Sequence, residues 1–233
     1  MRYAVRRMTE RAAYMDEPDA AGFVLAGGQS SRMGRDKALL PFAGEPLIAH
    51  AVSILLEAGL AVAIAGASSS ARTSLAAYAP VVEDSQPGLG PLSGICTAMA
   101  GTSARFAVFL PVDLPLLPPS LIAYLLHHAS ITGHAVTVPS MNGFIQTFPA
   151  VLERSALPEL QNELHSGQRG CFSAFRAAAD GLGQPIAGLD VELLAQTGQN
   201  SHPLGLPPVR WFHNVNTPQD LRRAEGLIAH AIA

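Results

Sequence analysis

Residues 25–37 form a loop rich in glycine and basic side chains, and their types and spacing are suited to binding a phosphate group. The loop reads Leu-Ala-Gly-Gly-Gln-Ser-Ser-Arg-Met-Gly-Arg-Asp-Lys. Glycine lets the backbone approach a ligand closely, so that successive amides can point at one anion. The cations Arg32, Arg35 and Lys37 would neutralise a polyphosphate. Glycine and serine clusters also mark ordinary solvated turns. Three cations beside three glycines favour the phosphate site over the turn.

The loop does not follow either of the two familiar phosphate-binding patterns. A P-loop requires Gly, four residues and then Gly-Lys-Ser/Thr, and this string does not occur in the chain. A dinucleotide fingerprint requires G-x-G-x-x-G, whereas here Gly27 and Gly28 are adjacent and the next glycine is Gly34. The loop therefore indicates an anion site of another kind.

Two carboxylates follow apolar runs of strand length. Asp113 comes directly after the run at residues 106–110, and Asp84 follows the run at residues 81–83 and precedes a second glycine-rich segment. Mg²⁺ usually binds one or two carboxylates together with phosphates and waters. We therefore expect Asp113 to bind a metal ion and Asp84 to accept hydrogen bonds from nucleotide or pterin groups. The alternatives are an aspartate that only caps the turn before Pro115, and a simple Pro-Gly turn that leads into a helix.

The remaining chain alternates short apolar runs with longer helical patterns. The predicted strands are Gly22–Leu25, Ala61–Ala65, Val81–Glu83, Ala107–Leu110 and Ala135–Pro139. The predicted helices are Pro46–Glu57, Ser68–Ala77, Gly90–Ala100, Pro119–Ser130 and Thr217–Ala231. This order, with apolar strands that lack strict alternation, predicts a single α/β domain with a doubly wound, mostly parallel sheet and helices on both faces. Ligands of such sheets bind beyond the carboxyl ends of the strands, which is where residues 25–37 and Asp113 would lie.

Two segments, residues 1–20 and residues 180–208, differ in composition from the rest of the chain. Residues 1–20 are rich in charges and contain no apolar segment typical of a secretory signal, so we expect a disordered extension, or a true start at Met15. The domain would then cover residues 21–233. Glycine, proline, glutamine and asparagine dominate residues 180–208. We expect a variable surface excursion there, with one short helix around Val191–Gln196.

Overall composition excludes several classes of protein. Of the 233 residues 48% are hydrophobic and the net charge is −3, which argues against a general nucleic-acid binder. No apolar run reaches the roughly 18 residues that would suggest a membrane span. Cys96 and Cys171 have no metal-ligand or redox spacing, so we expect buried free thiols in a cytoplasmic protein.

Taken together, the motifs resemble those of the MobA-type nucleotidyltransferases, and the molybdenum cofactor guanylyltransferases in particular. The family signature L-A-G-G-x-S-x-R-M-G-x-D-K matches residues 25–37, and its E-D with G-P-L-x-G-I matches Glu83-Asp84 with Gly90–Ile95. The family's P-x-D-x-P matches residues 111–115 and its V-N-T-P matches residues 215–218. The match runs in the right order from about residue 22 to residue 226. It implies a Rossmann-like nucleotidyltransferase fold.

The resemblance also implies residue roles. The base and phosphates of a nucleotide would be held by Leu25, Ala26, Gly27, Gly28, Lys37, Asp84 and Asp113. The catalytic residues would be Arg32, Lys37 and Asp113, with Asp113 as the ligand of Mg²⁺. The second substrate would be bound by Gly90, Pro91, Leu92, Ser93, Gly94, Asn214 and Asn216. One departure is that the family often has an asparagine after the second strand, where this chain reads Ile-Ala-Gly-Ala-Ser at residues 64–68. A nucleotide contact is therefore missing there or supplied by Ser68.

The implied reaction is transfer of GMP from Mg-GTP to the phosphate of molybdopterin or Mo-molybdopterin, with release of pyrophosphate. Partners would include molybdopterin-loading proteins and molybdoenzyme chaperones. Gly27 favours GTP, because alanine there would add a methyl group beside a purine. Alternatives are transfer from CTP, an acceptor that is a sugar or alditol phosphate, and a non-catalytic nucleotide-binding cofactor chaperone.

Overall fold

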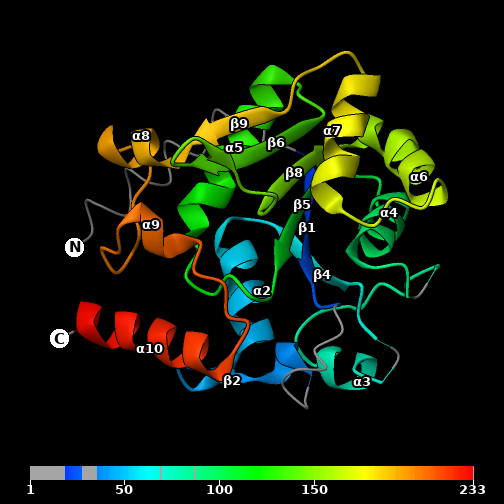
Figure 1. Cartoon of the computed structure of the whole chain (residues 1–233). Helices are drawn as coiled ribbons and strands as arrows, with labels where there is room; N and C mark the ends of the chain where they lie inside the picture. Colours follow the sequence, from blue (N-terminus) through cyan, green and yellow to red (C-terminus); the bar gives the residue numbers. More distant parts are fainter. Residues whose placement is uncertain (1–18, 28–35, 69, 87, 233) are drawn as a thin grey trace, which may run out of the picture.

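One mixed sheet forms the centre of the molecule (Figure 1). The computed structural model describes residues 19–27, 36–68, 70–86 and 88–232. In these residues the strand order is β4-β1-β5-β8-β6-β7, and β9 also pairs with β6. The bounds are β1 Ala20–Leu25, β4 Ala61–Ala65, β5 Phe106–Pro111, β6 Val136–Met141, β7 Phe144–Ile145, β8 Ala150–Glu153 and β9 Ala187–Asp190.

The sheet is mostly parallel, as predicted. Strand β1 runs parallel to both β4 and β5, and β9 runs parallel to β6. Strand β8 is inserted antiparallel between β5 and β6, and β7 is antiparallel to β6. Strands β1, β4 and β5 therefore end at one edge of the sheet, and the chain enters β8 at that same edge.

Helices cover both faces of the sheet, which confirms the predicted fold class (Figure 1). Within β1, Val24 faces the core shared with α2 and α5, whereas Phe23 and Leu25 face the core shared with α4, α6 and α7. The longer helices are α2 Leu47–Glu57, α4 Pro91–Ala100, α5 Pro119–Thr132, α6 Leu157–His165, α7 Cys171–Gly181 and α10 Pro218–Ile232. The shorter elements are η2 Lys37–Leu39, β2 Pro41–Phe42, β3 Glu45–Pro46, α3 Arg72–Leu75, η3 Arg154–Ala156, α8 Val191–Gln196 and α9 Pro208–Trp211.

Helix α10 packs its apolar residues on the same core as α2 and lies along the side of the molecule that carries α8 and α9 (Figure 1). Leu221, Ala224, Leu227 and Ile228 provide that apolar face. Glu225 adds a polar anchor, since its Oε1 accepts a hydrogen bond from Ala43 N in the β2–β3 turn at 3.2 Å. The middle of α10 is thereby tied to the β2–β3 turn.

Several local expectations were wrong. Val81–Glu83 forms no strand, because only an isolated bridge joins Val81 to Ile64 after Pro80. The helix predicted over Ser68–Ala77 is shortened to α3. The expected surface excursion at residues 180–208 contributes β9 to the central sheet, while its predicted short helix is α8. Most of the expected extension at residues 1–20 lies outside the described residues.

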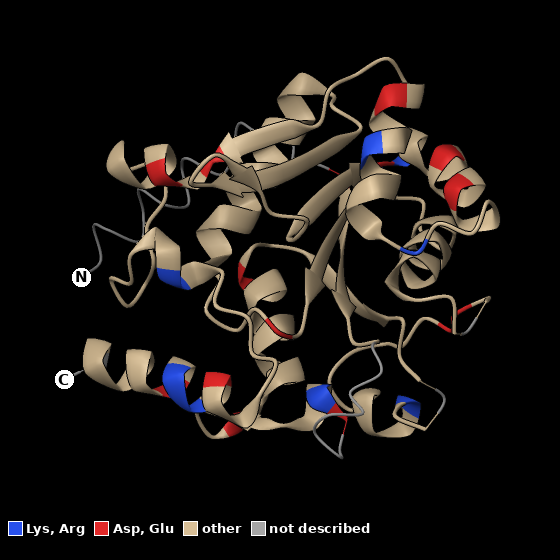
Figure 2. Ribbon diagram, viewed as in Figure 1, with Lys and Arg blue, Asp and Glu red and all other residues tan. Residues whose placement is uncertain are grey.

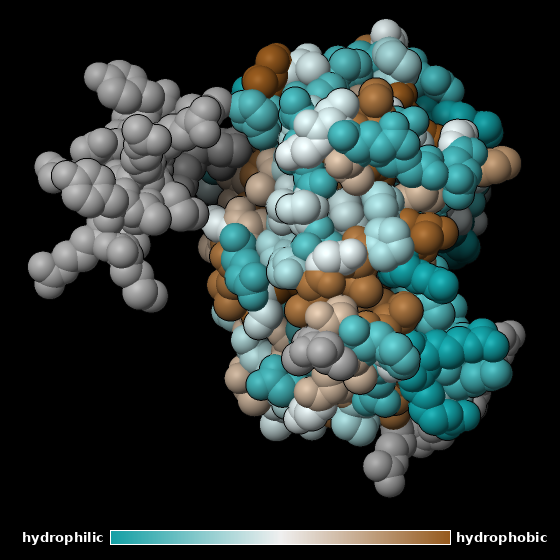
Figure 3. Space-filling view, turned by 90° about the vertical axis from the view of Figure 1, so that its left-hand side faces the viewer, coloured by the Kyte–Doolittle hydropathy of each residue, from teal (hydrophilic) through white to brown (hydrophobic). Residues whose placement is uncertain are grey.

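The distribution of charged residues on the surface is consistent with the low net charge of the chain. In the view of Figure 2, acidic and basic residues of the described chain are dispersed over the outer helices and loops. Figure 3 shows hydrophobic residues in a band across the side that carries α8, α9 and α10, between more polar regions. Cys96 and Cys171 are buried free thiols, as expected, and burial raises their pKa to about 11 and about 12. Among the helices that the structure describes, none is both long and apolar enough to cross a membrane.

Candidate active site

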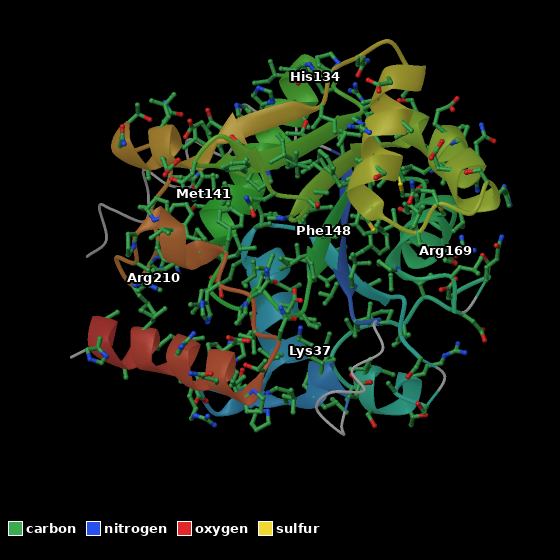
Figure 4. The ribbon with its side chains drawn as sticks, viewed as in Figure 1. Lys37, His134, Met141, Phe148, Arg169 and Arg210 are labelled. Atoms are coloured by element: carbon green, nitrogen blue, oxygen red, sulfur yellow. The ribbon has the colours of Figure 1, made fainter. Side chains whose placement is uncertain are left out.

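Lys37 connects three distant parts of the chain at the carboxyl edge of the sheet. Its Nζ donates hydrogen bonds to Asp113 Oδ2 at 3.0 Å and to Asn216 Oδ1 at 2.7 Å. Lys37 begins η2, which is capped by Asp36 through a bond from Ala38 N at 3.0 Å. In Figure 4, Lys37 lies beside the first turn of α10, below the ends of the central strands. The structure thus brings together the predicted catalytic residues Lys37 and Asp113.

Backbone hydrogen bonds fix these segments against one another. Val215 N donates to the Asp113 carbonyl at 2.9 Å, and Val112 N donates to the Leu25 carbonyl at 3.3 Å. The side chains of Lys37 and Asp113 are 19% and 25% exposed. The attraction within an ion pair that is largely shielded from water is screened less by salt than the attraction within a surface pair. The exposed part of the two side chains remains accessible to a ligand.

The donor set around Asp113 fits Mg²⁺ shared with a nucleotide. Lys37 bonds to one oxygen of the carboxylate, and among the described residues no hydrogen bond goes to the other oxygen, which could bind a cation. Within the part of the chain that the structure describes, no group of three or more His, Cys, Asp or Glu side chains could hold a metal ion alone. Mg²⁺ commonly takes one carboxylate and completes its octahedron with phosphates and waters. We therefore keep Asp113 as the predicted metal ligand.

Asp84 organises the second glycine-rich segment. Its Oδ1 accepts hydrogen bonds from Ser93 Oγ at 2.5 Å, from Gln86 N at 3.0 Å and from Thr97 Oγ1 at 3.4 Å. Ser93 is buried and also donates to the Gln86 carbonyl at 3.0 Å. These bonds hold Asp84 and Gln86 against the first two turns of α4. Asp84 Oδ1 therefore stabilises this segment. The predicted contact of Asp84 with a nucleotide would use its other carboxylate oxygen, and it stays a prediction.

Three glycines meet where β1, β4 and α4 converge. A Cβ on Gly27 would lie 2.1 Å from the Gly66 carbonyl oxygen, and a Cβ on Gly94 would lie 3.0 Å from Gly66 Cα. Gly27 was expected to leave room beside a purine, but the Gly66 carbonyl occupies the space that a methyl group on residue 27 would take. Gly66 has φ +70, in the left-handed region that glycine and asparagine tolerate best. Glycine is therefore well suited to this position directly after β4.

The other predicted residues are placed as follows. Leu25 is buried in the core at the end of β1, and Ala26 N donates to the Ala65 carbonyl at 3.0 Å. Gly90, with φ +85, precedes Pro91 at the first position of α4, where Leu92, Ser93 and Gly94 are buried. Ser68 accepts a hydrogen bond from Ala71 N at 3.3 Å before α3, so its oxygen serves the local turn. Asn214 is exposed, and Gly28 and Arg32 lie outside the described residues.

The sequence interpretation missed two features of this site. It assigned Asn216 to the second substrate and Lys37 to phosphate, but did not predict that the two side chains touch. The Thr-Pro-Gln-Asp string at residues 217–220 predicts a helix start with an acidic first turn, which α10 confirms, but Asp220 was given no role at the site. Its Oδ2 accepts hydrogen bonds from Asn216 N and Thr217 N.

Comparison with known proteins assigns the chain to a family. The sequence profile of the MobA-like NTP transferase domain matches residues 22–182. The chain belongs to this family. A protein of Haloferax mediterranei named probable molybdenum cofactor guanylyltransferase is 31% identical over 92% of this chain and 97% of its own. A Rhizobium meliloti protein named molybdenum cofactor guanylyltransferase is 30% identical over 96% of this chain and 97% of its own.

Solved structures agree with the family at the level of the fold. The molybdopterin-guanine dinucleotide biosynthesis protein A of Archaeoglobus fulgidus superimposes with a TM-score of 0.73 at 22% identity, covering 90% of this chain and 99% of that one. A CMP:2-keto-3-deoxy-manno-octonic acid synthetase superimposes with a TM-score of 0.63 at 17% identity, covering 91% of this chain and 99% of that one. The predicted family is confirmed, and the chain is a nucleotidyltransferase.

Proposed function

We propose that this MobA-like protein is a molybdenum cofactor guanylyltransferase that moves GMP from Mg-GTP to the phosphate of molybdopterin or Mo-molybdopterin. Relatives with that name align along almost the whole chain. The observation that carries the mechanism is the contact of Lys37 with Asp113 on one side and Asn216 on the other. Such a contact joins a nucleotide site to a second substrate site.

In the proposed reaction, an oxygen of the acceptor phosphate forms a bond to the α-phosphorus of GTP. The bond from that phosphorus to the β-phosphate oxygen breaks, and its electron pair leaves with pyrophosphate. The acceptor phosphate is already an anion at neutral pH, so the enzyme needs no general base. The main barrier is the repulsion between two anions, which fixed positive charge reduces.

Lys37 is suited to reduce that repulsion. An ammonium group has three donors, and Asp113 and Asn216 take two of them. Among the acceptors that the structure describes, these are the two that Lys37 uses, and the third donor would bind a phosphate oxygen of the nucleotide. Because both partners restrain the ammonium, little side-chain freedom is lost when the nucleotide binds.

Asn216 and Asp113 complete the arrangement. Asn216 accepts from Lys37 through Oδ1, which leaves its two amide hydrogens for the phosphate of the acceptor. Asp113 would hold Mg²⁺ through its remaining carboxylate oxygen. The bound ion would supply charge that neutralises the nucleotide phosphates and the departing pyrophosphate. Arg32, Gly28 and Asp84 keep their proposed roles at the phosphates and the base.

We propose GTP as the donor because the similar proteins carry guanylyltransferase names. We also propose that the protein works in the cytoplasm, where free thiols such as Cys96 and Cys171 persist. The product would pass to a molybdoenzyme or to the chaperone that loads it.

The test is pyrophosphate release with Mg²⁺, each of the four nucleoside triphosphates, and either molybdopterin or sugar phosphates. The proposal expects release only with GTP and molybdopterin. Release with CTP or with a sugar phosphate alone would reassign the donor or the acceptor. Binding of GTP without any release would point to a non-catalytic cofactor chaperone.

A further inference from the structure

We propose that Asp220 is a positioning residue for the transfer reaction, because its carboxylate fixes the backbone that presents Asn216 to Lys37. The inference rests on the proposed function. Asp220 Oδ2 accepts hydrogen bonds from Asn216 N at 3.1 Å, from Thr217 N at 2.8 Å and from Thr217 Oγ1 at 2.8 Å. One oxygen atom thus orders the turn that leads into α10.

The contacts form a continuous path from α10 to the nucleotide side. Asp220 holds the Asn216 backbone, Asn216 Oδ1 accepts from Lys37, and Lys37 donates to Asp113. The same turn is tied to Asp113 a second time, through the bond from Val215 N to the Asp113 carbonyl at 2.9 Å. A shift of Asn216 therefore changes the position of the Lys37 ammonium.

An ordinary capping box explains only part of this arrangement. In such a box the N-cap threonine and the acidic residue three positions later exchange side chain to backbone hydrogen bonds. Thr217 and Asp220 do so, since Asp220 N also donates to Thr217 Oγ1 at 3.2 Å. The additional bond from Asn216 N lies before the N-cap and is not required by the helix. It places Asp220 in contact with the residue that touches Lys37.

Two neighbouring contacts also stabilise this part of the chain, but neither of them provides the hydrogen bond that Asp220 accepts from Asn216 N. The His213 ring nitrogen Nε2 lies 3.2 Å from the Asp220 carbonyl oxygen, which closes residues 213–220 into a compact turn. Glu225 anchors α10 at its bond with Ala43, one turn further along the helix. Glu225 therefore offers a matched control: it lies on the same helix, and its side chain accepts from Ala43 N rather than from the Asn216 backbone.

The first experiment is a double-mutant cycle on pyrophosphate release. Asp220→Ala is expected to lower kcat by between about tenfold and a hundredfold, as displacement of a catalytic group does. In an Asn216→Ala background, Asp220→Ala is expected to cause no further loss, because its effect passes through Asn216. If the losses of kcat in Asp220→Ala and Asn216→Ala were fully additive in the double variant, the inference would be overturned. A loss of kcat in Glu225→Ala equal to that in Asp220→Ala would also overturn it.

The second experiment does not depend on turnover. The side-chain amide signal of Asn216 is assigned in a ¹H–¹⁵N spectrum by its disappearance in Asn216→Ala. It is expected to shift in Asp220→Ala and to stay in place in Glu225→Ala, and an unmoved signal in Asp220→Ala would overturn the inference. If the alanine variant does not fold, Asp220→Ser, whose side chain is one atom shorter than that of aspartate, is compared in the same way. Absence of pyrophosphate release by the unaltered protein would reject the proposed function alone.

Discussion

Gly27 lies against Gly66 so closely that a Cβ on residue 27 would be 2.1 Å from the Gly66 carbonyl oxygen. The two residues follow β1 and β4, and Gly94 of α4 approaches Gly66 from another direction. Backbone from three segments, the ends of β1 and β4 and the start of α4, therefore packs together beside the candidate nucleotide site. Side chains at these positions would separate the segments and widen the site.

Gly27→Ala is expected to destabilise the protein by about 1–3 kcal/mol, because the added methyl group must displace backbone rather than a flexible side chain. It should also weaken GTP binding. Thermal unfolding and calorimetric titration would measure the two effects. Gly226→Ala is the control, since a Cβ there meets nothing within 4 Å and lies within α10. A Gly27→Ala variant with normal stability and GTP affinity would contradict this prediction.

Lys37→Ala is expected to lower kcat by about 10²–10³-fold, which is typical for loss of a group that stabilises transition-state charge. Pyrophosphate release measures the effect. Arg72→Ala is a matched control, because it removes a cation whose ion pair with Glu83 is 3.0 Å long but 48% and 76% exposed. Exposed pairs contribute little, so this variant should behave as the unaltered protein does. Equal activity of both variants would remove Lys37 from the mechanism.

Asp113→Asn is expected to raise the Mg²⁺ concentration needed for half-maximal pyrophosphate release, because a neutral amide is a weaker ligand than a carboxylate. The shape of the side chain is kept, so the fold should persist. Asp190→Asn is the parallel control. Asp190 caps α8 by accepting from Leu193 N at 2.9 Å, and asparagine caps helices equally well. An unchanged Mg²⁺ dependence in Asp113→Asn would show that the metal binds elsewhere.

Stability is expected to fall as the pH drops below about 6.5. Burial lowers the pKa of His128, helped by the charges of His134 and His127, and burial also lowers the pKa of His202. A histidine whose pKa is lower in the folded state contributes stability above its ordinary pKa of 6.5. That contribution is lost as the pH falls from 6.5 through the lower folded-state pKa.

Thermal unfolding between pH 8 and pH 5, in the unaltered protein and in His128→Gln and His202→Gln, would test this pH dependence. Each substitution should reduce the slope of the melting temperature against pH in that window. Identical slopes in all three proteins would assign the acid sensitivity to other groups.

The sequence predicted that Lys37 and Asp113 lie at the same edge of the sheet, because the evidence for that placement is local. Residues 25–37 and Asp113 each follow an apolar run, and parallel strands bring their carboxyl ends to one edge. The contact of Lys37 with Asn216 could not be foreseen in this way. It joins residues separated by 179 positions and depends on the path of the chain through α9 and into α10.

The missed elements have separate physical reasons. Helix α7 could have been found, because Cys171, Ala174, Phe175 and Ala178 follow helical spacing and are all buried. Strand β8 is four residues long and antiparallel to both neighbours, so its place depends on pairing rather than on its own pattern. Strand β9 lies in a stretch rich in glycine and proline, and this composition predicts a loop. The stretch forms a strand because it pairs with β6.

The bond between Val215 and Asp113 also bears on how the enzyme is made. Lys37 and Asp113 are synthesised long before Asn216 and the capping residues of α10. A chain emerging from the ribosome therefore acquires its nucleotide-side residues first, and Asn216, which joins them to the acceptor side, only afterwards. Under the proposed function, a nascent chain shorter than 216 residues lacks the contact that couples the two substrates, so it would not transfer GMP.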